Sequence, residues 1–218
     1  MAAWSLRARI AIACLLLFCV SMGAGTASYA GGSWLHPQAP SHSFLENFWC
    51  DLLREPAHNG LPNATSVRFG MLGFSALAVA LAAFWLEMAD FFADWRRPFL
   101  RVAGLLSSAG TALVALLPSD RFPVLHAPAV LSAGGLGFAC GCICAVWAMR
   151  HFDRARMFGV ASLVLVSAAA VNLGLYVWVA YLRGVDTVVL PVAQKVATVA
   201  LLVWIVGGLS FNAYRPKP

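Results

Sequence analysis

Residues 124–149 read VLHAPAVLSAGGLGFACGCICAVWAM, a run that contains no Asp, Glu, Lys or Arg. About 20 predominantly apolar residues are enough for a helix to cross the hydrocarbon core of a bilayer, and a charge near the centre of that core is costly. This stretch therefore predicts a membrane-spanning helix. The rest of the chain shows the same alternation of long apolar runs and short charged segments.

The overall composition agrees with this interpretation. Of the 218 residues, 61% are hydrophobic and 11% are charged, whereas about a quarter of the residues of a soluble domain are charged. A soluble domain of this size could not bury so much apolar surface, and a disordered chain has the opposite composition. The 15 Lys and Arg residues are too few and too scattered for a nucleic-acid-binding domain. The class that remains is an integral membrane protein, whose expected partner is membrane lipid and not nucleic acid.

Charged residues set the limits of the apolar runs and predict an all-α fold, a six-transmembrane-helix bundle that forms a single domain over residues 1–218. The expected helices lie at about 10–29, 69–86, 102–119, 124–149, 157–182 and 196–214, with an outer loop at 31–67. Within that loop, Ser43 and Glu46 have the spacing of a capping box, and the apolar residues of 43–54 repeat on one helix face. We expect a short amphipathic helix there, lying on the bundle.

The basic residues are unevenly distributed between the predicted connections. If the N-terminus is inside, ten of the 15 lie in cytoplasmic segments, and the positive-inside rule then places both termini in the cytoplasm. An alternative stays open, because residues 1–22 also have the form of a signal peptide, with Ser28-Tyr29-Ala30 as a cleavage site. Cleavage there would leave five crossings and an external N-terminus.

Small residues recur every four positions along the 124–149 helix. Lipid tails supply no hydrophobic drive between helices, so such a stripe favours close backbone approach. We therefore expect this helix in the middle of the bundle, with the 102–119 helix, which carries Gly104, Ser107 and Gly110, as one neighbour. The same stripe is the candidate surface for a membrane-protein partner. Its members are Ala129, Ala133, Gly137, Gly141 and Ala145.

The same helix carries Cys140, Cys142 and Cys144. Only Cys140 and Cys144 share a helix face, and a zinc site needs four converging ligands. Free cysteines commonly pack as small apolar residues. We therefore expect buried thiols, with no metal and no cofactor.

Polar residues inside or beside the apolar runs gather toward the predicted outer side. His126 and Asn172 lie within apolar runs, where a polar side chain needs a partner. We expect an outward-facing pocket lined by His126, Asp120, Asn172 and Lys195 and roofed by the outer loop. Histidine with carboxylate can perform general-base chemistry, so His126 and Asp120 are the candidate catalytic residues. The candidate ligand-binding residues are Asn172, Lys195, Gln194, Tyr176 and Asp51.

Short motifs give the chain a family resemblance. Tyr29-Ala30-Gly31-Gly32 directly after the first helix and Phe44-x-x-Asn47-Phe48-x-Cys50-Asp51-Leu52 in the outer loop resemble a group of six-helix bacterial membrane proteins of unknown function. Gly110, Pro118 and His126 complete the match. That group is distantly similar to the DRAM and GPI-lipid-remodelling membrane proteins. The resemblance implies a six-helix bundle with a structured first outer loop and a place in the bacterial inner membrane. It implies no reaction.

A weaker likeness is to the alkaline ceramidase and adiponectin-receptor superfamily, but the last predicted helix contains no His, so no zinc ligands are carried over. The sequence thus favours a membrane protein that binds or remodels a lipid or small amphiphile. The alternative is an accessory or assembly subunit of a membrane complex, without catalytic activity. Whether the protein is an enzyme stays open.

Overall fold

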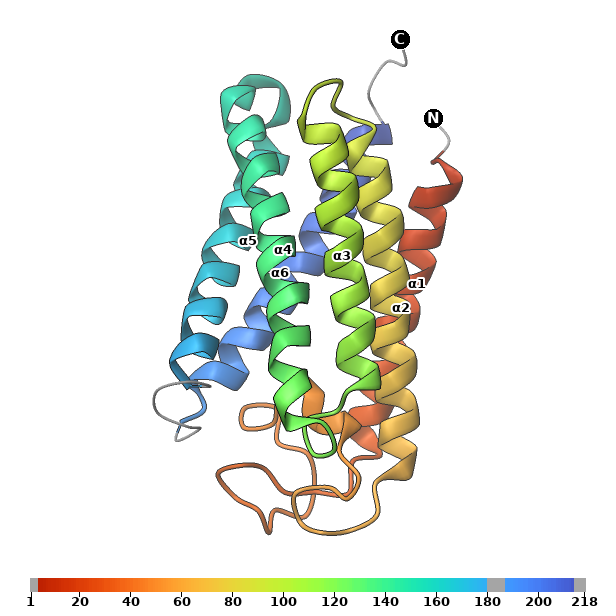
Figure 1. Ribbon diagram of the computed structural model, residues 1–218, viewed down its shortest axis with the longest axis vertical. Helices are drawn as coiled ribbons and strands as arrows, with labels where there is room; N and C mark the ends of the chain where they lie inside the picture. Colours follow the sequence, from red (N-terminus) through yellow and green to blue (C-terminus); the bar gives the residue numbers. More distant parts are fainter. Residues whose placement is uncertain (1–3, 180–186, 214–218) are drawn as a thin grey trace.

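The computed structural model is an all-helical bundle, and Figure 1 shows the helices running roughly side by side. It describes residues 4–179 and 187–213, without the side chains of 152–154, 212 and 213. The helices are α1 (Leu6–Ala27), α2 (Ala64–Ala89), α3 (Arg96–Leu116), α4 (Pro123–Arg150), α5 (Phe152–Trp178) and α6 (Val189–Ala213), with a 3-10 helix, η1 (Trp49–Leu53), between α1 and α2.

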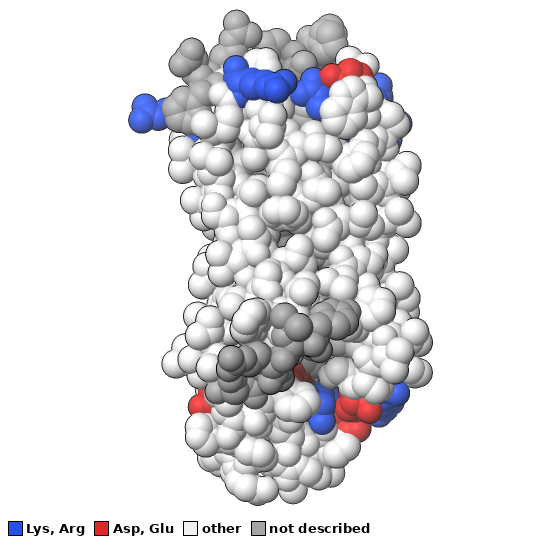
Figure 2. Space-filling view, turned by 60° about the vertical axis from the view of Figure 1, so that its left-hand side comes forward, with Lys and Arg blue, Asp and Glu red and all other residues white. Residues whose placement is uncertain are grey.

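Within the described residues, six helices are long enough and apolar enough to cross a membrane. The predicted six-helix membrane bundle is therefore confirmed, and the chain is a multi-pass integral membrane protein. Figure 2 shows the charged side chains gathered at the two ends of the molecule, with an uncharged band between them. The start of α1 and the end of α6 lie at one end, which we call the terminal end. The connection between α1 and α2 lies at the other, the loop end (Figure 1).

Helices that follow one another in sequence pack side by side from α1 to α6. Helix α6 runs obliquely behind α4 and reaches α2, which it also contacts (Figure 1). Helix α2 is the central element, because 61% of its apolar window is buried, against 28% for α4 and 11% for α5. The expectation that the 124–149 helix lies in the middle of the bundle is therefore wrong.

The small-residue stripe of α4 nevertheless packs as predicted on α3. Ser107 Oγ donates a hydrogen bond to the Ala133 carbonyl at 2.6 Å. A Cβ on Gly110 would lie 2.6 Å from Ala133 N, and one on Gly137 would lie 2.9 Å from Ser107 Oγ. The two backbones approach this closely only because these positions carry small side chains. At Ala133 and Gly137 the stripe is therefore covered by α3 of the same chain.

Several helices begin or end beyond their predicted limits, because charged residues were assumed to lie outside the spans. Helix α1 begins at Leu6, not 10, since Arg7 pairs with Asp90 at 2.6 Å. Helix α2 begins at Ala64 and includes Arg68, and α3 begins at Arg96. Helix α6 begins at Val189, not 196, and includes Lys195. The predicted ends of the last two helices, at 182 and 214, lie outside the described residues.

The helical segment of the outer loop is shorter than the amphipathic helix expected over 43–54. Only Trp49–Leu53 is helical, as a 3-10 helix. Side chains take the backbone bonds that a longer helix would use, since Asn47 Oδ1 accepts from Ser43 N at 2.8 Å and Asp51 Oδ2 accepts from Phe48 N at 2.9 Å. Such local side-chain bonds compete with helix formation. Residues 28–63 instead form a folded cap over the loop end (Figure 1).

Candidate functional site

A cavity of about 230 Å³ lies inside the bundle, between α2, α3, α4, α5 and α6, and reaches Cys50 of η1 at the loop end. Small residues on three helices leave the space open: Ala133, Gly134 and Gly137 on α4, Ala169 on α5 and Ala197 on α6. Helix α6 crosses behind α4 (Figure 1). The lining comes from the helices of the bundle and from Cys50 of η1.

The cavity is elongated along the helices. Its wall runs over Phe74–Trp85 on α2, Val130–Gly141 on α4, Leu165–Tyr176 on α5 and Gln194–Trp204 on α6. From the rise per residue of an α-helix, stretches of this length span about 16 Å along the helix axis. The space is thus a narrow channel parallel to the membrane spans, closed over at the loop end by the cap.

Four polar side chains of the cavity wall gather near the loop end of α5 and α6: Asn172, Tyr176, Gln194 and Thr198. Two more, Ser107 and Thr111 on α3, already donate their hydroxyls to the carbonyls of Ala133 and Ser107. The Oδ1 atom of Asn172 is buried without a hydrogen-bond partner, which costs about 1–3 kcal/mol in a protein interior. Asn172 lines the cavity, so a bound molecule with a hydrogen-bond donor beside this side chain would satisfy the acceptor.

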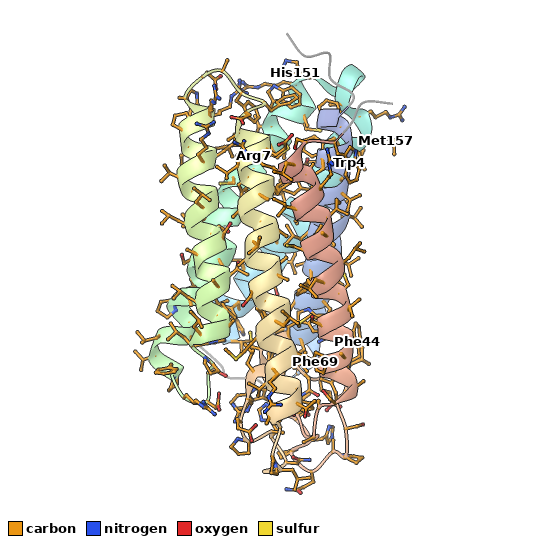
Figure 3. The ribbon with its side chains drawn as sticks, turned by 90° about the vertical axis from the view of Figure 1, so that its right-hand side faces the viewer. Trp4, Arg7, Phe44, Phe69, His151 and Met157 are labelled. Carbon is orange, nitrogen blue, oxygen red and sulfur yellow. The ribbon has the colours of Figure 1, made fainter. Side chains whose placement is uncertain are left out.

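The cap is fastened directly over this polar part of the wall. Trp49 donates from its backbone N to Gln194 Oε1 at 2.9 Å and from its indole Nε1 to Thr198 Oγ1 at 3.2 Å. Lys195 Nζ donates to the Asn47 carbonyl and lies 5.1 Å and 5.2 Å from the ring centroids of Phe44 and Trp49. Figure 3 shows Phe44 near the level of Phe69 on α2, so the cap folds back toward the helices. Helix α6 therefore supplies both a wall of the cavity and the anchor of the cap.

The cap is held together by a buried polar network around Asp51. Asp51 Oδ1 lies 3.1 Å from His58 Nε2, and their side chains are 4% and 7% exposed. Asp51 Oδ2 also accepts from Asn47 Nδ2 at 3.0 Å, and the same Nδ2 donates to the Gly32 carbonyl at 2.8 Å. Gly31 and Gly32 have positive φ, and a Cβ on either would lie within 2.6 Å of a backbone oxygen. Gly31, Gly32, Asn47 and Asp51, which belong to the two sequence motifs, thus all help to hold the cap in its folded conformation.

Three further side chains of the cap are uncharged at neutral pH. Burial, with the nearby Asp51 carboxylate, raises the pKa of Tyr29 to about 12. Burial and the Lys195 cation lower the pKa of His42 to about 4. Burial, with Asp51, raises the pKa of the Cys50 thiol to about 12. Cys50 is therefore a neutral thiol where it meets the cavity.

The structure divides the predicted site residues between two places. Asn172, Tyr176 and Gln194 line the cavity. Lys195 on α6 and Asp51 in the cap both bind the backbone of the cap. The cavity wall, as far as its residues are described, does not include His126, Asp120 or Lys195.

His126 and Asp120 both hold connections in place. His126 Nδ1 lies 2.7 Å from the Leu117 carbonyl, at the C-terminus of α3, so the ring donates to a carbonyl that has no partner within the helix. Asp120 Oδ2 accepts from Glu55 N at 3.1 Å and joins the α3–α4 connection to the cap. Each residue therefore has a structural partner on the backbone.

No cluster of three or more His, Cys, Asp or Glu side chains is placed to hold a metal ion within residues 4–179 and 187–213. All six cysteines are free thiols, and Cys140 and Cys144 are buried while Cys142 is half-buried.

The terminal end carries a different kind of site. Asp90 accepts hydrogen bonds from Arg7, Arg97 and Arg101, which ties α1, α2 and α3 together. A second cavity, of about 390 Å³, lies at the same end between α3 and α4 and includes Arg96 and Arg150 in its wall. Figure 3 shows Arg7 at the opposite end of the molecule from Phe44. Asp94, which pairs with Arg96 at 2.6 Å, also lines this second cavity.

Sequence reasoning missed several residues of the central cavity. Trp85 lines it, and Thr198 and Trp49 join its wall to the cap. An i, i+4 pair of polar residues, Gln194 and Thr198, was the available signal for a polar helix face. Trp85 gave no signal, because an aromatic residue within an apolar run packs in most cases as core.

No family model, no curated protein and no solved structure matches the chain. The fold and the cavity define the class by themselves. It is a multi-pass integral membrane protein with an elongated internal cavity beneath a folded loop.

Proposed function

We propose that the protein binds a lipid or another small amphiphile in the central cavity. The single observation that carries the proposal is that Asn172, whose Oδ1 is buried and unpaired, lines a mostly apolar 230 Å³ space. Ligand sites are typically apolar concavities with a few polar groups that fix orientation. The surroundings of a membrane protein supply amphiphiles that match such a lining.

The proposed orientation places the loop end outside and both termini in the cytoplasm. Positive residues favour the cytoplasmic side of a membrane protein. Arg7, Arg96, Arg97, Arg101 and Arg150 all lie at the terminal end. Together with the resemblance to bacterial membrane proteins, this favours the bacterial inner membrane, with the cap facing away from the cytoplasm.

Helix α1 belongs to the folded bundle in this proposal. Its residues Leu15, Phe18 and Met22 are buried in the core, and Tyr29 of the suspected cleavage site is 5% exposed. The alternative function, an accessory subunit docked through the stripe of α4, gains no support, because α3 occupies that stripe at Ala133 and Gly137.

Filling the cavity tests the proposal. Ala169 lines the cavity and the adjacent Ala170 is exposed on the outer face of α5. The variant Ala169→Phe should therefore exclude the ligand, while Ala170→Phe adds the same ring where lipid would surround it. In native mass spectrometry after mild extraction, the wild type and Ala170→Phe should retain a bound molecule of lipid size, and Ala169→Phe should retain none. Equal retention in all three proteins would contradict the proposal.

A further inference from the structure

We infer that the ligand is an electrically neutral, single-chain amphiphile whose head group donates a hydrogen bond to Asn172 Oδ1 and whose chain extends toward Trp204. This inference rests on the proposed function, and it names the class of ligand that the cavity accepts. Three observations support it: the charge of the lining, the placement of its polar atoms, and the size of the space.

The described lining of the cavity contains no Asp, Glu, Lys, Arg or His. Burying a charge without a partner is far more costly than burying a hydrogen-bonded neutral group. Lys195 is the nearby cation, but this residue is only 3% exposed. Its ammonium group already donates hydrogen bonds to the carbonyls of Asn47 and Pro191. A phosphate or carboxylate in the cavity would therefore find no counter-charge, whereas a hydroxyl or amide would find Asn172.

The two ends of the cavity differ in polarity. Near the loop end stand Asn172 with its unpaired Oδ1, Gln194 and Thr198. At the deep end, Trp204 Nε1 is already bonded to Ser162 Oγ at 2.8 Å. Trp85 packs against α3, since a Cβ on Gly104 would come within 2.9 Å of Trp85 Cδ1, and its unpaired Nε1 is a donor that cannot accept from a hydroxyl. The head group therefore belongs at the loop end and the chain at the deep end.

The size of the space limits the ligand to one chain. A cavity of about 150 Å³ holds a benzene-sized molecule, and pockets for drug-sized ligands begin at about 300 Å³. The central cavity, at about 230 Å³, falls between these values, yet its wall extends over about 16 Å of helix. A narrow space of that length suits one hydrocarbon chain and leaves no room for the second chain of a phospholipid.

A series of amphiphiles with the same chain and different head groups tests the inference. Monooctanoylglycerol is neutral and has hydroxyl donors, methyl octanoate is neutral and has acceptors only, and octanoate is anionic. Binding to delipidated protein is measured by native mass spectrometry and by the shift of the unfolding temperature. Only binding that Ala169→Phe abolishes counts as cavity binding, because octanoate can also reach the arginine-lined cavity at the terminal end.

We expect cavity binding in the order monooctanoylglycerol, methyl octanoate, octanoate. The variant Asn172→Leu should weaken monooctanoylglycerol binding about tenfold, the effect of about one hydrogen bond left unmade in a buried site, and leave methyl octanoate nearly unchanged. Val171→Leu, at an exposed position of the same helix, is the matched control and should change neither. Octanoate binding in the cavity as tightly as monooctanoylglycerol, or an unchanged affinity in Asn172→Leu, would overturn the inference and leave the proposed function standing. Failure of all three compounds to bind in the cavity would overturn both.

Discussion

Replacing Asp51 with Ala should lower the free energy of unfolding by about 3–5 kcal/mol, because several donors of a buried polar network lose their acceptor, at about 1–3 kcal/mol each. Asp51 accepts from His58, from the Asn47 side chain and from the backbone N of Phe48, and it is 2% exposed. Removing the carboxylate leaves three donors in the cap without their acceptor. Because the cap is fastened to α6 through Asn47 and Trp49, its loss should also open the loop end of the cavity.

Unfolding in detergent micelles, followed by circular dichroism, measures this effect. Asp94→Ala is the matched control, since Asp94 forms an exposed pair with Arg96 at the terminal end, and surface pairs contribute little to stability. We expect little change in that variant. If Asp51→Ala unfolded together with the wild type, the polar network would not hold the cap, and the account of the loop motif would be wrong.

A single methyl group on Gly110 should destabilise the bundle by about 1–3 kcal/mol, the typical effect of overpacking a close contact. The added Cβ would lie 2.6 Å from Ala133 N and 3.1 Å from Ala133 Cα, so the clash involves backbone that cannot rotate away. Helix α4 would have to move from α3, which would also break the Ser107–Ala133 hydrogen bond and change the cavity wall.

Gly134→Ala is the control for this prediction, because a Cβ there meets nothing within 4 Å. Alanine favours a helix over glycine by up to about 1 kcal/mol, so Gly134→Ala should be neutral or slightly stabilising. The same micelle unfolding experiment compares the two variants. Equal stability of Gly110→Ala and Gly134→Ala would contradict the close α3–α4 contact.

The number and type of the helices followed from the sequence. A long run without charged residues forms a helix in a membrane, because a helix satisfies the hydrogen bonds of its own backbone. The 124–149 prediction lies within one residue of α4 at each end. The starts of α1 and α6 were placed too late, at 10 and 196. Charged residues mark the limits of an apolar core, but Arg7 and Lys195 belong to helices since each finds its partner beside the bundle, on Asp90 and on the cap.

The site was predicted only in part. Asn172, Tyr176 and Gln194 were named and do line the cavity, because polar residues within apolar runs are informative in a membrane. His126 satisfied the same criterion and Asp120 was chosen as its carboxylate partner, yet both bind backbone at the α3–α4 connection. Sequence spacing shows which residues share a helix face, but the direction of that face depends on how six helices pack. The oblique path of α6 has no signature in the sequence.

The most direct test of the central claim is to locate the ligand inside the bundle. A monoacylglycerol brominated in the middle of its chain can be soaked into crystals of the protein, and the anomalous signal of bromine gives its position. The account predicts a peak within the channel, between Asn172 and Trp204, that is absent from crystals of Ala169→Phe. Bromine peaks only on the outer surface of the helices, with the channel unoccupied in the wild type, would contradict it.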